Sequence, residues 1–312
     1  MKTIAVLGAN GRLANEVMQV FVRNNFRVIA VTRNGDVRHA PPGIESRAAD
    51  AMDEAGLIAA TEGADFIFNG LNPAYTEWQD KVLPMAKNVI AAAAHHGAIH
   101  LFPGNVYNYG EAIPAACKEQ TPFQANDHKG LIRIEMEALF AAAAEQGVAT
   151  TMIRAGDFYG GSGTGSWFDL VLTSKLAKGK FTYPGDPAIE HSWAYIPDLA
   201  KAFLAVAQRS DRSGGFERFG FAGHTLSGIE LQQLLEQACG KTLQRGSMPW
   251  PMIKLLGWFV PMLREIAGVS YLWFRPHRID GQQLQRELGE LELTPPAVAV
   301  KETLLQLKLN VV

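Results

Sequence analysis

The sequence predicts an α/β protein with a Rossmann-type, doubly wound parallel sheet and a smaller, mainly helical C-terminal substrate domain. Three observations carry this prediction. A glycine-rich turn directly follows the first apolar run, apolar runs then alternate with helical stretches, and the alternation stops after residue 155. Strands that alternate with helices are typical of a parallel sheet covered on both faces, with the ligand across the carboxyl ends of the strands.

The glycine-rich turn lies between a predicted strand at residues 4–7 and a predicted helix at residues 12–22. Small residues recur in it at three-residue spacing, as Gly8, Gly11 and Ala14. Small residues let a phosphate approach the backbone, and the free N–H groups at a helix start favour negative charge. The residues expected around the pyrophosphate of a dinucleotide are Gly8, Asn10, Gly11, Arg12 and Leu13.

Further apolar runs predict the other strands of the sheet. They cover residues 26–32, 44–49, 64–70, 98–102 and 148–154, with another strand at 219–222. Long helices are expected at residues 77–96 and 126–146. This order predicts a dinucleotide-binding domain of residues 1–155 and 193–223, and a substrate-binding cap of residues 156–192 and 224–312.

The end of the second strand decides which dinucleotide we expect. An acidic residue there would bond the 2′-hydroxyl of NAD, whereas a basic residue would pair with the 2′-phosphate of NADP. Arg33 occupies this place, no Asp or Glu lies between residues 28 and 34, and Arg12 is in the nearby glycine turn. Because arginine binds phosphate oxygens with two nitrogens, the sequence favours NADP, with NAD as the alternative. The other interpretation of both arginines is a solvated surface role.

Two further strand ends are expected near the cofactor, since parallel strands end at one edge of a sheet. Asn69 and Gly70 end the fourth strand, and Asp50 follows the third. Asp50 is a candidate for contact with the adenine side of the cofactor. The simpler interpretation is that this segment is a turn before a helix whose N-cap is Asp53.

Composition excludes several classes of partner. Apolar residues make up 47% and charged residues 19% of the chain, as in an ordinary globular enzyme. The net charge of −2 gives no indication of nucleic acid or of a membrane as partner. Two widely separated cysteines, Cys117 and Cys239, favour a reducing compartment. The first strand follows Lys2 directly, so we expect no signal peptide and a cytoplasmic location.

No metal site and no hydrolytic motif is expected. His95, His96 and His100 cluster near a helix end, but no carboxylate or thiol stands at metal-ligand spacing from them. A Gly-x-Ser-x-Gly elbow and a Walker lysine are both absent from the sequence, which argues against a serine hydrolase and a nucleoside triphosphatase.

Residues 249–274 form a markedly apolar stretch that contains Trp250, Trp258, Phe259 and Trp273. Charged residues and prolines interrupt it, so it does not predict a membrane-spanning helix. We interpret it as core of the cap, with a wall for an apolar substrate or a dimer face as alternatives.

Four segments point to one family. They are the glycine turn at residues 8–14 and the stretches 106–110, 153–160 and 193–200. With them the chain resembles the extended short-chain dehydrogenase/reductase superfamily, in particular its NAD-dependent epimerase/dehydratase-like branch, over about residues 1–222. The resemblance implies binding of NAD or NADP, a carbonyl- or hydroxyl-bearing small metabolite as substrate, and a homodimer formed by the two long helices.

The catalytic residues that the resemblance implies are missing. The family uses a Tyr, a Lys four residues later on the same helix, and a Ser or Thr after the fifth strand. The spacing places the ammonium beside the phenol, whose pKa it lowers. In this chain Asn105 stands at the Ser/Thr position, Lys129 at the Tyr position and Arg133 at the Lys position. This departure makes the catalytic site non-standard.

Other residues could replace the missing pair. Lys129 could donate a proton if burial beside Arg133 lowered its pKa, and Arg133 could hold the nicotinamide ribose. The Asn105 amide could bond a carbonyl, while Tyr107 and Tyr159 are further acid candidates. Alternatively, Lys129 and Arg133 form a solvated helix edge. Two functions remain open: an oxidoreductase or epimerase-like enzyme, or a non-catalytic NADP(H)-binding redox sensor or regulatory protein.

Overall fold

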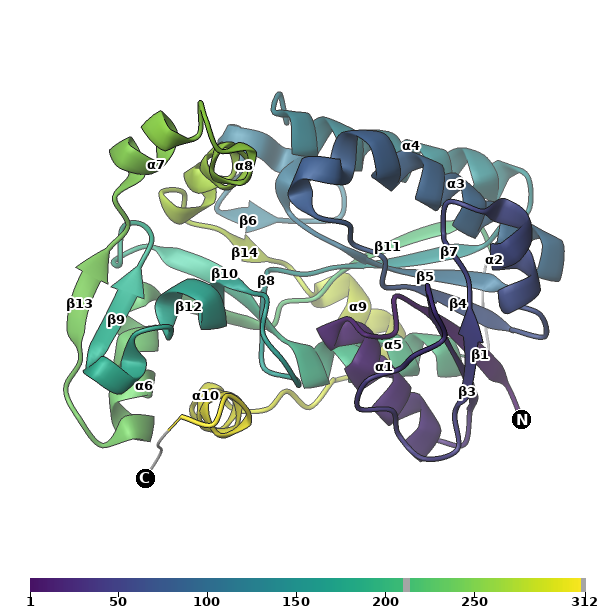
Figure 1. Cartoon of the computed structure of the whole chain (residues 1–312), viewed down its shortest axis with the longest axis horizontal. Helices are drawn as coiled ribbons and strands as arrows, with labels where there is room; N and C mark the ends of the chain where they lie inside the picture. The colour runs from purple at the N-terminus through teal and green to yellow at the C-terminus, as the bar shows by residue number, and fades with distance from the viewer. Residues whose placement is uncertain (210–213, 310–312) are drawn as a thin grey trace.

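The computed structural model describes residues 1–209 and 214–309, which form a parallel sheet covered by helices on both faces and a smaller part beside it (Figure 1). Within these residues, the large sheet has the order β11-β7-β5-β4-β1-β2-β3, and all neighbouring strands are parallel. The predicted doubly wound fold is confirmed. The strands are β1 Thr3–Leu7, β2 Arg27–Thr32, β3 Glu45–Ala48, β4 Phe66–Asn69, β5 Ile99–Gly104, β7 Thr150–Arg154 and β11 Phe216–Gly220.

Successive side chains of the central strands enter two different core clusters. Leu7 and Val31 pack on one face, whereas Val6 and Ala30 pack on the other. Because both faces are buried, the strands read as continuous apolar runs rather than as an alternating pattern. Helices α2 Glu54–Ala60, α3 Trp78–His96 and α4 His128–Glu145 cover the first face, and α1 Arg12–Arg23, α5 Ile196–Gln208 and α9 Gln282–Leu288 cover the second (Figure 1).

The two edges of the sheet differ most from the sequence prediction. The strand expected at residues 219–222 is found at Phe216–Gly220, where it pairs with β7 as a seventh strand. At the other edge, β3 is shorter than expected and alternates half-buried and exposed residues. An edge strand has a partner on one side only, so its apolar run is short and its pattern is weak.

The smaller part is built from short strands and helices that come mostly from the second half of the chain. Its three-stranded sheet contains β8 Asp157–Tyr159, β10 Glu190–Tyr195 and β12 His224–Ser227. Two-stranded pairs join β9 Lys180–Tyr183 to β13 Gln244–Ser247, and β6 Ala116–Cys117 to β14 Arg278–Ile279. The helices of this part are α6 Gly228–Cys239, α7 Trp250–Leu256, α8 Pro261–Gly268 and α10 Pro296–Gln306.

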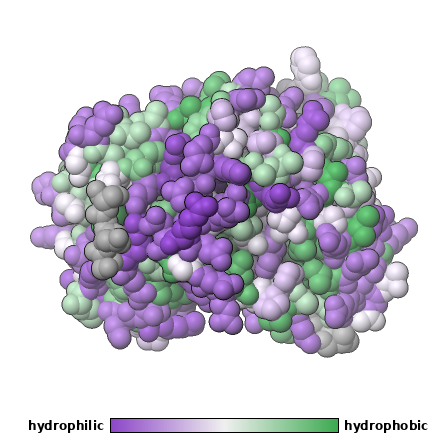
Figure 2. Space-filling view, turned by 180° about the vertical axis from the view of Figure 1, so that it is seen from behind, coloured by the Kyte–Doolittle hydropathy of each residue, from purple (hydrophilic) through white to green (hydrophobic). Residues whose placement is uncertain are grey.

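The surface mixes polar and apolar residues, and hydrophilic residues gather over the middle of the face shown in Figure 2. In the described part of the chain, no helix has the length and apolar character needed to cross a membrane.

Candidate functional site

A cavity of about 1790 Å³ runs across the carboxyl ends of the parallel strands. Its walls include residues that directly follow β1, β2, β3, β4, β5 and β7. A doubly wound sheet binds its ligand at this edge. Every residue predicted for the cofactor lines this cavity, namely Gly8, Asn10, Gly11, Arg12, Leu13, Arg33, Asp50, Asn69, Gly70 and Arg133.

The glycine turn after β1 allows close approach of the backbone. Gly8 has a φ of +65°, and a Cβ on it would lie 2.9 Å from the carbonyl oxygen of Gly70. A Cβ on Gly70 would lie 2.7 Å from the carbonyl oxygen of Leu7. α1 begins at Arg12, and no described side chain caps it at Gly11. Its first N–H groups are therefore free to bind an anion.

The Arg12 side chain is occupied by the chain itself. Its Nη1 forms an ion pair with Asp169 Oδ1 at 2.6 Å and donates to Ser166 Oγ at 2.8 Å, and Nη2 donates to the Gly160 carbonyl at 2.6 Å. Arg12 thus ties the loop after β8 to the start of α1. This arrangement corrects the expectation that Arg12 and Arg33 share one 2′-phosphate.

Two exposed arginines line the cavity after β2, the predicted Arg33 and a second one, Arg38, that the sequence analysis missed. Asn10 holds their loop in place, since its Nδ2 donates to the Asp36 carbonyl at 2.9 Å and its Oδ1 accepts from the Arg38 N–H at 2.7 Å. One indication of Arg38 was present in the sequence, because it is a second basic residue in the loop that begins with Arg33. Arg33 and Arg38 supply the basic pair that we expected from Arg33 and Arg12.

Asp50 is exposed in the cavity wall, and its Oδ1 accepts from the Met52 N–H at 3.0 Å. Asp53 precedes α2 as expected, but its side chain makes no capping hydrogen bond. Asn69 is buried, and its Oδ1 accepts from the Leu71 N–H at 3.2 Å. The side chains of Asp50 and Asn69 therefore shape turns in the cavity wall.

Polar groups that follow β5 lie at another part of the cavity. Asn105 Oδ1 accepts from the Tyr107 N–H at 3.1 Å, so the amide nitrogen is the group that can donate to a ligand. The Tyr107 hydroxyl lies 2.8 Å from the Tyr75 hydroxyl. Burial raises the pKa of both phenols, that of Tyr107 well above its ordinary value. Both phenols therefore stay protonated and serve as hydrogen-bond donors.

Arg133 is a buried cation that faces this part of the cavity. Its side chain is only 9% exposed, and its guanidinium lies 4.5 Å from the ring centre of Trp78. Burial lowers its pKa to about 10, so it remains charged at neutral pH. Its Nε has no hydrogen-bond partner among the described residues. A buried donor without a partner indicates a place for a ligand, and the solvated-edge interpretation is wrong for Arg133.

Lys129 is absent from the cavity lining, which corrects its expected role as proton donor. Its ammonium lies 2.6 Å from Glu265 Oε2 and donates to the Glu265 carbonyl at 2.8 Å. The long side chain reaches from the start of α4 to α8, and it is 4% exposed. Lys129 therefore holds α8 against the large domain. Like Arg133, it is buried, so the solvated-edge interpretation is wrong for it as well.

Tyr159 is also placed away from the cavity. It is 1% exposed, and its hydroxyl is hydrogen bonded to His224 Nδ1. Its ring stacks on Phe168 with 5.2 Å between the ring centres. Burial raises the pKa of this phenol far above its ordinary value. Tyr159 is thus a core residue of the smaller part, and its expected role as an acid is corrected.

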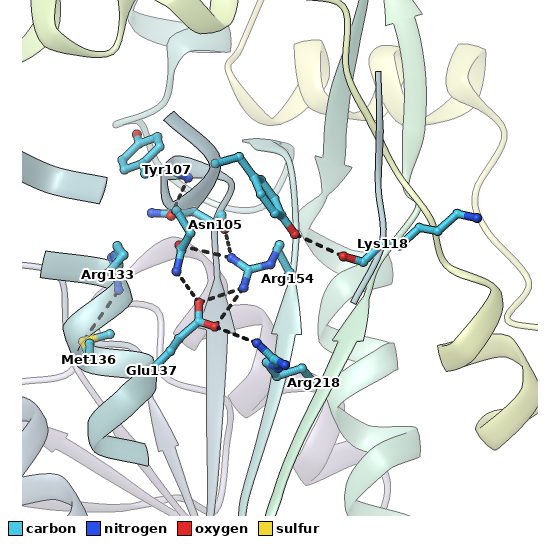
Figure 3. A network of polar contacts seen from close by, with 10 residues as sticks. Asn105, Tyr107, Lys118, Arg133, Met136, Glu137, Arg154 and Arg218 are labelled. Carbon is cyan, nitrogen blue, oxygen red and sulfur yellow. Dashed lines mark hydrogen bonds and ion pairs between the residues drawn. The ribbon is translucent and has the colours of Figure 1, made fainter. Parts of the chain in front are cut away.

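A buried ion pair supports the loop that carries Asn105 (Figure 3). Arg154, at the end of β7, lies with its Nη2 at 2.8 Å and 3.0 Å from the two carboxylate oxygens of Glu137 on α4. Its Nη1 donates to the carbonyl of Asn105 and to the side chain of Asn108. Arg154 and Glu137 are 5% and 4% exposed. This pair fixes the backbone of the loop from two neighbouring elements.

One acidic group of the cavity, Asp157, was not among the residues predicted from the sequence. Its carboxylate Oδ2 lies 2.8 Å from Nε2 of His191 on β10. His191 is 1% exposed and stacks on Trp273 with 4.4 Å between ring centres and 6° between the planes. Asp157 and Tyr107 line the same cavity. Burial, then the neighbouring Tyr75, then the charge of Asp157 raise the pKa of the Tyr107 phenol. The sequence signal was an acid in the glycine-containing segment that follows the predicted strand at residues 148–154.

The cavity thus combines an anion-binding backbone turn, two basic side chains, a buried cation and a carboxylate backed by a fixed imidazole. The backbone turn and the basic side chains suit a phosphate-bearing dinucleotide. The buried cation and the carboxylate suit charge stabilisation and proton transfer. Residues 1–209 and 214–309 contain no group of three or more His, Cys, Asp or Glu that could hold a metal ion.

Known proteins give the same assignment of the fold. The structure is similar to UDP-glucose 4-epimerase of Thermotoga maritima with UDP-glucose, at 15% identity and a TM-score of 0.79 over 98% of both chains. It is also similar to UDP-glucose 4-epimerase of Bifidobacterium longum in complex with NAD⁺ and UDP, at 17% identity and a TM-score of 0.77 over 98% of both chains. MoeE5 in complex with UDP-glucuronic acid and NAD gives 15% identity and a TM-score of 0.77 over 99% of both chains.

These identities show a shared fold. A comparison with curated proteins finds no match. The model of the NmrA-like family matches residues 1–289, which is most of the chain. The chain therefore belongs to the NmrA-like family, an atypical branch of the short-chain dehydrogenase/reductase superfamily with an NAD(P)-binding Rossmann fold.

Proposed function

We propose that the protein is a cytoplasmic, NADP(H)-dependent oxidoreductase or epimerase-like enzyme for a carbonyl- or hydroxyl-bearing small metabolite. One observation carries the proposal. A single cavity joins the anion-binding turn at residues 8–12 to Asn105, Arg133 and Asp157. A protein that only binds a dinucleotide has no need for an acid–base group beyond it.

The cavity walls suggest how the cofactor would bind. The pyrophosphate would lie against the glycine turn and the start of α1, where backbone N–H groups are free. Arg33 and Arg38 would pair with the 2′-phosphate of NADP, with NAD as the alternative. The unpaired Nε of Arg133 suits a hydroxyl of the nicotinamide ribose, the task that the resemblance assigns to a lysine at this position.

Proton transfer is the task that the chain itself must perform, because the bound cofactor supplies the hydride. We assign it to Asp157 in place of the missing tyrosine. If a carbonyl were reduced here, its carbon would accept the hydride and its oxygen would accept a proton delivered by the hydrogen-bonded pair of Asp157 and His191. His191, hydrogen bonded to the same carboxylate, can return a proton to it. The Tyr107 hydroxyl and the Asn105 amide can orient the oxygen.

The second candidate is a non-catalytic NADP(H)-binding regulatory protein. One observation favours it, because Lys129 and Tyr159 are both committed to structural contacts outside the cavity. For either candidate we propose a homodimer through α3 and α4, as the resemblance implies.

Titration with NADPH and NADH, followed by nicotinamide fluorescence, tests the proposed cofactor. We expect NADPH to bind more tightly, and both Arg33→Ala and Arg38→Ala to raise its Kd by about tenfold or more, since charge-assisted bonds to the 2′-phosphate are lost. The Kd for NADH should change by less than about twofold. Arg286→Ala, an exposed arginine on α9, is the matched control. Binding of neither nucleotide would exclude both candidate functions.

A further inference from the structure

The hairpin formed by α7 and α8 carries an apolar surface that no described segment covers. Trp258 and Phe259, between the two helices, are 86% and 81% exposed. Large aromatic side chains are rarely so exposed in a folded domain, and a cluster of them marks an interaction site. We call this cluster the hairpin tip, and its exposed apolar residues are Met252, Leu255, Leu256, Trp258, Phe259, Val260 and Met262.

The hairpin tip is fixed to the fold by other residues of the same stretch. Trp250 and Ile253 of α7 are 8% and 7% exposed and belong to the core of the smaller part. On α8, Glu265 pairs with the buried Lys129 of α4. Packing and an ion pair therefore hold the inner side of the hairpin on the protein. The outer apolar residues make no contribution to this attachment.

Two basic residues, Lys254 and Arg264, lie on the helices that carry the hairpin tip, although the whole chain has a net charge of −2. Arg264 is 67% exposed, and Lys254 is exposed on α7. Glu265, the acid next to Arg264 in the chain, is 16% exposed, and its carboxylate lies 2.6 Å from the Lys129 ammonium and 3.8 Å from Nε of Arg264. The cations therefore exceed this one carboxylate. The surface beside the apolar tip is therefore cationic.

We propose that the hairpin tip docks this protein on an anionic phospholipid surface. Tryptophan and phenylalanine are favoured at the boundary between headgroups and acyl chains, and flanking lysine and arginine residues are attracted to anionic headgroups. Trp258 and Phe259 are each more than four-fifths exposed, so they protrude from the protein and can insert into a lipid interface. α7 and α8 have 7 and 8 residues, so the contact is peripheral and does not cross the bilayer.

The position of the hairpin relates this contact to the cavity. Met262 is 40% exposed and also lines the cavity, as does Ile266 one turn further along α8. The rim of the cavity is thus continuous with the hairpin tip, and docking would bring this rim to the lipid surface. The expectation of no membrane partner rested on the net charge of the whole chain, which does not reveal the local charge of Lys254 and Arg264 beside the hairpin tip. The inference is independent of the proposed enzymatic activity.

Sedimentation of the full chain with vesicles tests the proposal. Vesicles of phosphatidylcholine alone are compared with vesicles that also contain about 30 mol% phosphatidylglycerol. We expect binding to the anionic vesicles, weaker binding by tenfold or more to the neutral ones, and loss of this difference in about 0.5 M NaCl, which screens the headgroup charge. No binding to either vesicle would overturn the proposal.

Matched variants locate the contact. The double variant Trp258→Ala/Phe259→Ala is expected to weaken vesicle binding about tenfold or more. The double variant Lys254→Glu/Arg264→Glu is expected to weaken it at least about fivefold for each charge that is reversed. Leu305→Ala, on the 54% exposed Leu305 of α10, and Lys87→Glu, on α3, should bind like the natural chain. A far-UV circular dichroism spectrum and a melting temperature like those of the natural chain show that each variant folds. If Trp258→Ala/Phe259→Ala instead abolishes self-association in ultracentrifugation and vesicles do not bind, the tip is an interface between two copies of the chain, and the proposal is wrong.

Discussion

Replacement of Asp157 by asparagine is expected to lower kcat by about 10²–10⁴-fold, the contribution of a well-placed proton donor. Asparagine keeps the size of the side chain and its contact with His191, but it cannot exchange the proton. The Kd for NADPH should stay within about twofold, because Asp157 is not assigned to the cofactor. The measurement is the oxidation of NADPH at saturating concentrations of a carbonyl substrate found by screening, with cofactor titration in parallel.

Lys129→Ala is the control that distinguishes Asp157 from Lys129, the proton donor expected from the sequence alone. Lys129 pairs with Glu265 and does not line the cavity, so its loss should lower kcat by less than about tenfold. If Lys129→Ala abolishes turnover and Asp157→Asn does not, the lysine is the proton donor and the assignment to Asp157 is wrong.

Glu137→Gln is expected to destabilise the protein by about 3–5 kcal/mol, the usual cost of leaving a buried charge without its partner. The guanidinium of Arg154, which is 5% exposed, would keep one acceptor in the amide oxygen but lose the second of the contacts at 2.8 Å and 3.0 Å together with the opposite charge. The Asn105 loop, held by the same guanidinium, should loosen as well. Urea unfolding followed by circular dichroism measures the free energy of unfolding.

Two variants test this explanation. Glu137→Met/Arg154→Met removes both charges, so it should be more stable than Glu137→Gln even though more polar atoms are lost. Glu45→Gln removes the ion pairs of the 39% exposed Glu45 with Arg27 and Arg47, and because these pairs are solvated it should cost no more than about 1 kcal/mol. Equal destabilisation by Glu137→Gln and Glu45→Gln would show that the buried pair has no special role.

The parts of the fold that the sequence predicted correctly depend on local patterns. The strand, glycine turn and helix around Gly8 follow from neighbouring residues. Glycine is needed at position 8 because a Cβ there would lie only 2.9 Å from the Gly70 carbonyl oxygen. The carboxyl ends of parallel strands then meet by topology, so every predicted cofactor residue lines the cavity.

The parts that the sequence did not predict depend on partners far away in the chain. Lys129 meets Glu265 across 136 residues, and Arg12 meets Asp169 across 157. Asp157 becomes an acid–base candidate only because β10 brings His191 beside it. Spacing along one helix could place Lys129 and Arg133 on the same face, but it could not show which of the two turns toward the cavity.

A crystal structure with NADP⁺ bound tests the central claim most directly. We expect the pyrophosphate on the glycine turn, the 2′-phosphate between Arg33 and Arg38, and the nicotinamide ribose within hydrogen-bond distance of Arg133, with the ring facing Asn105 and Asp157. A nicotinamide ring outside the part of the cavity that contains Asn105, Arg133 and Asp157 would contradict the account, since no hydride could then reach a substrate held beside Asp157.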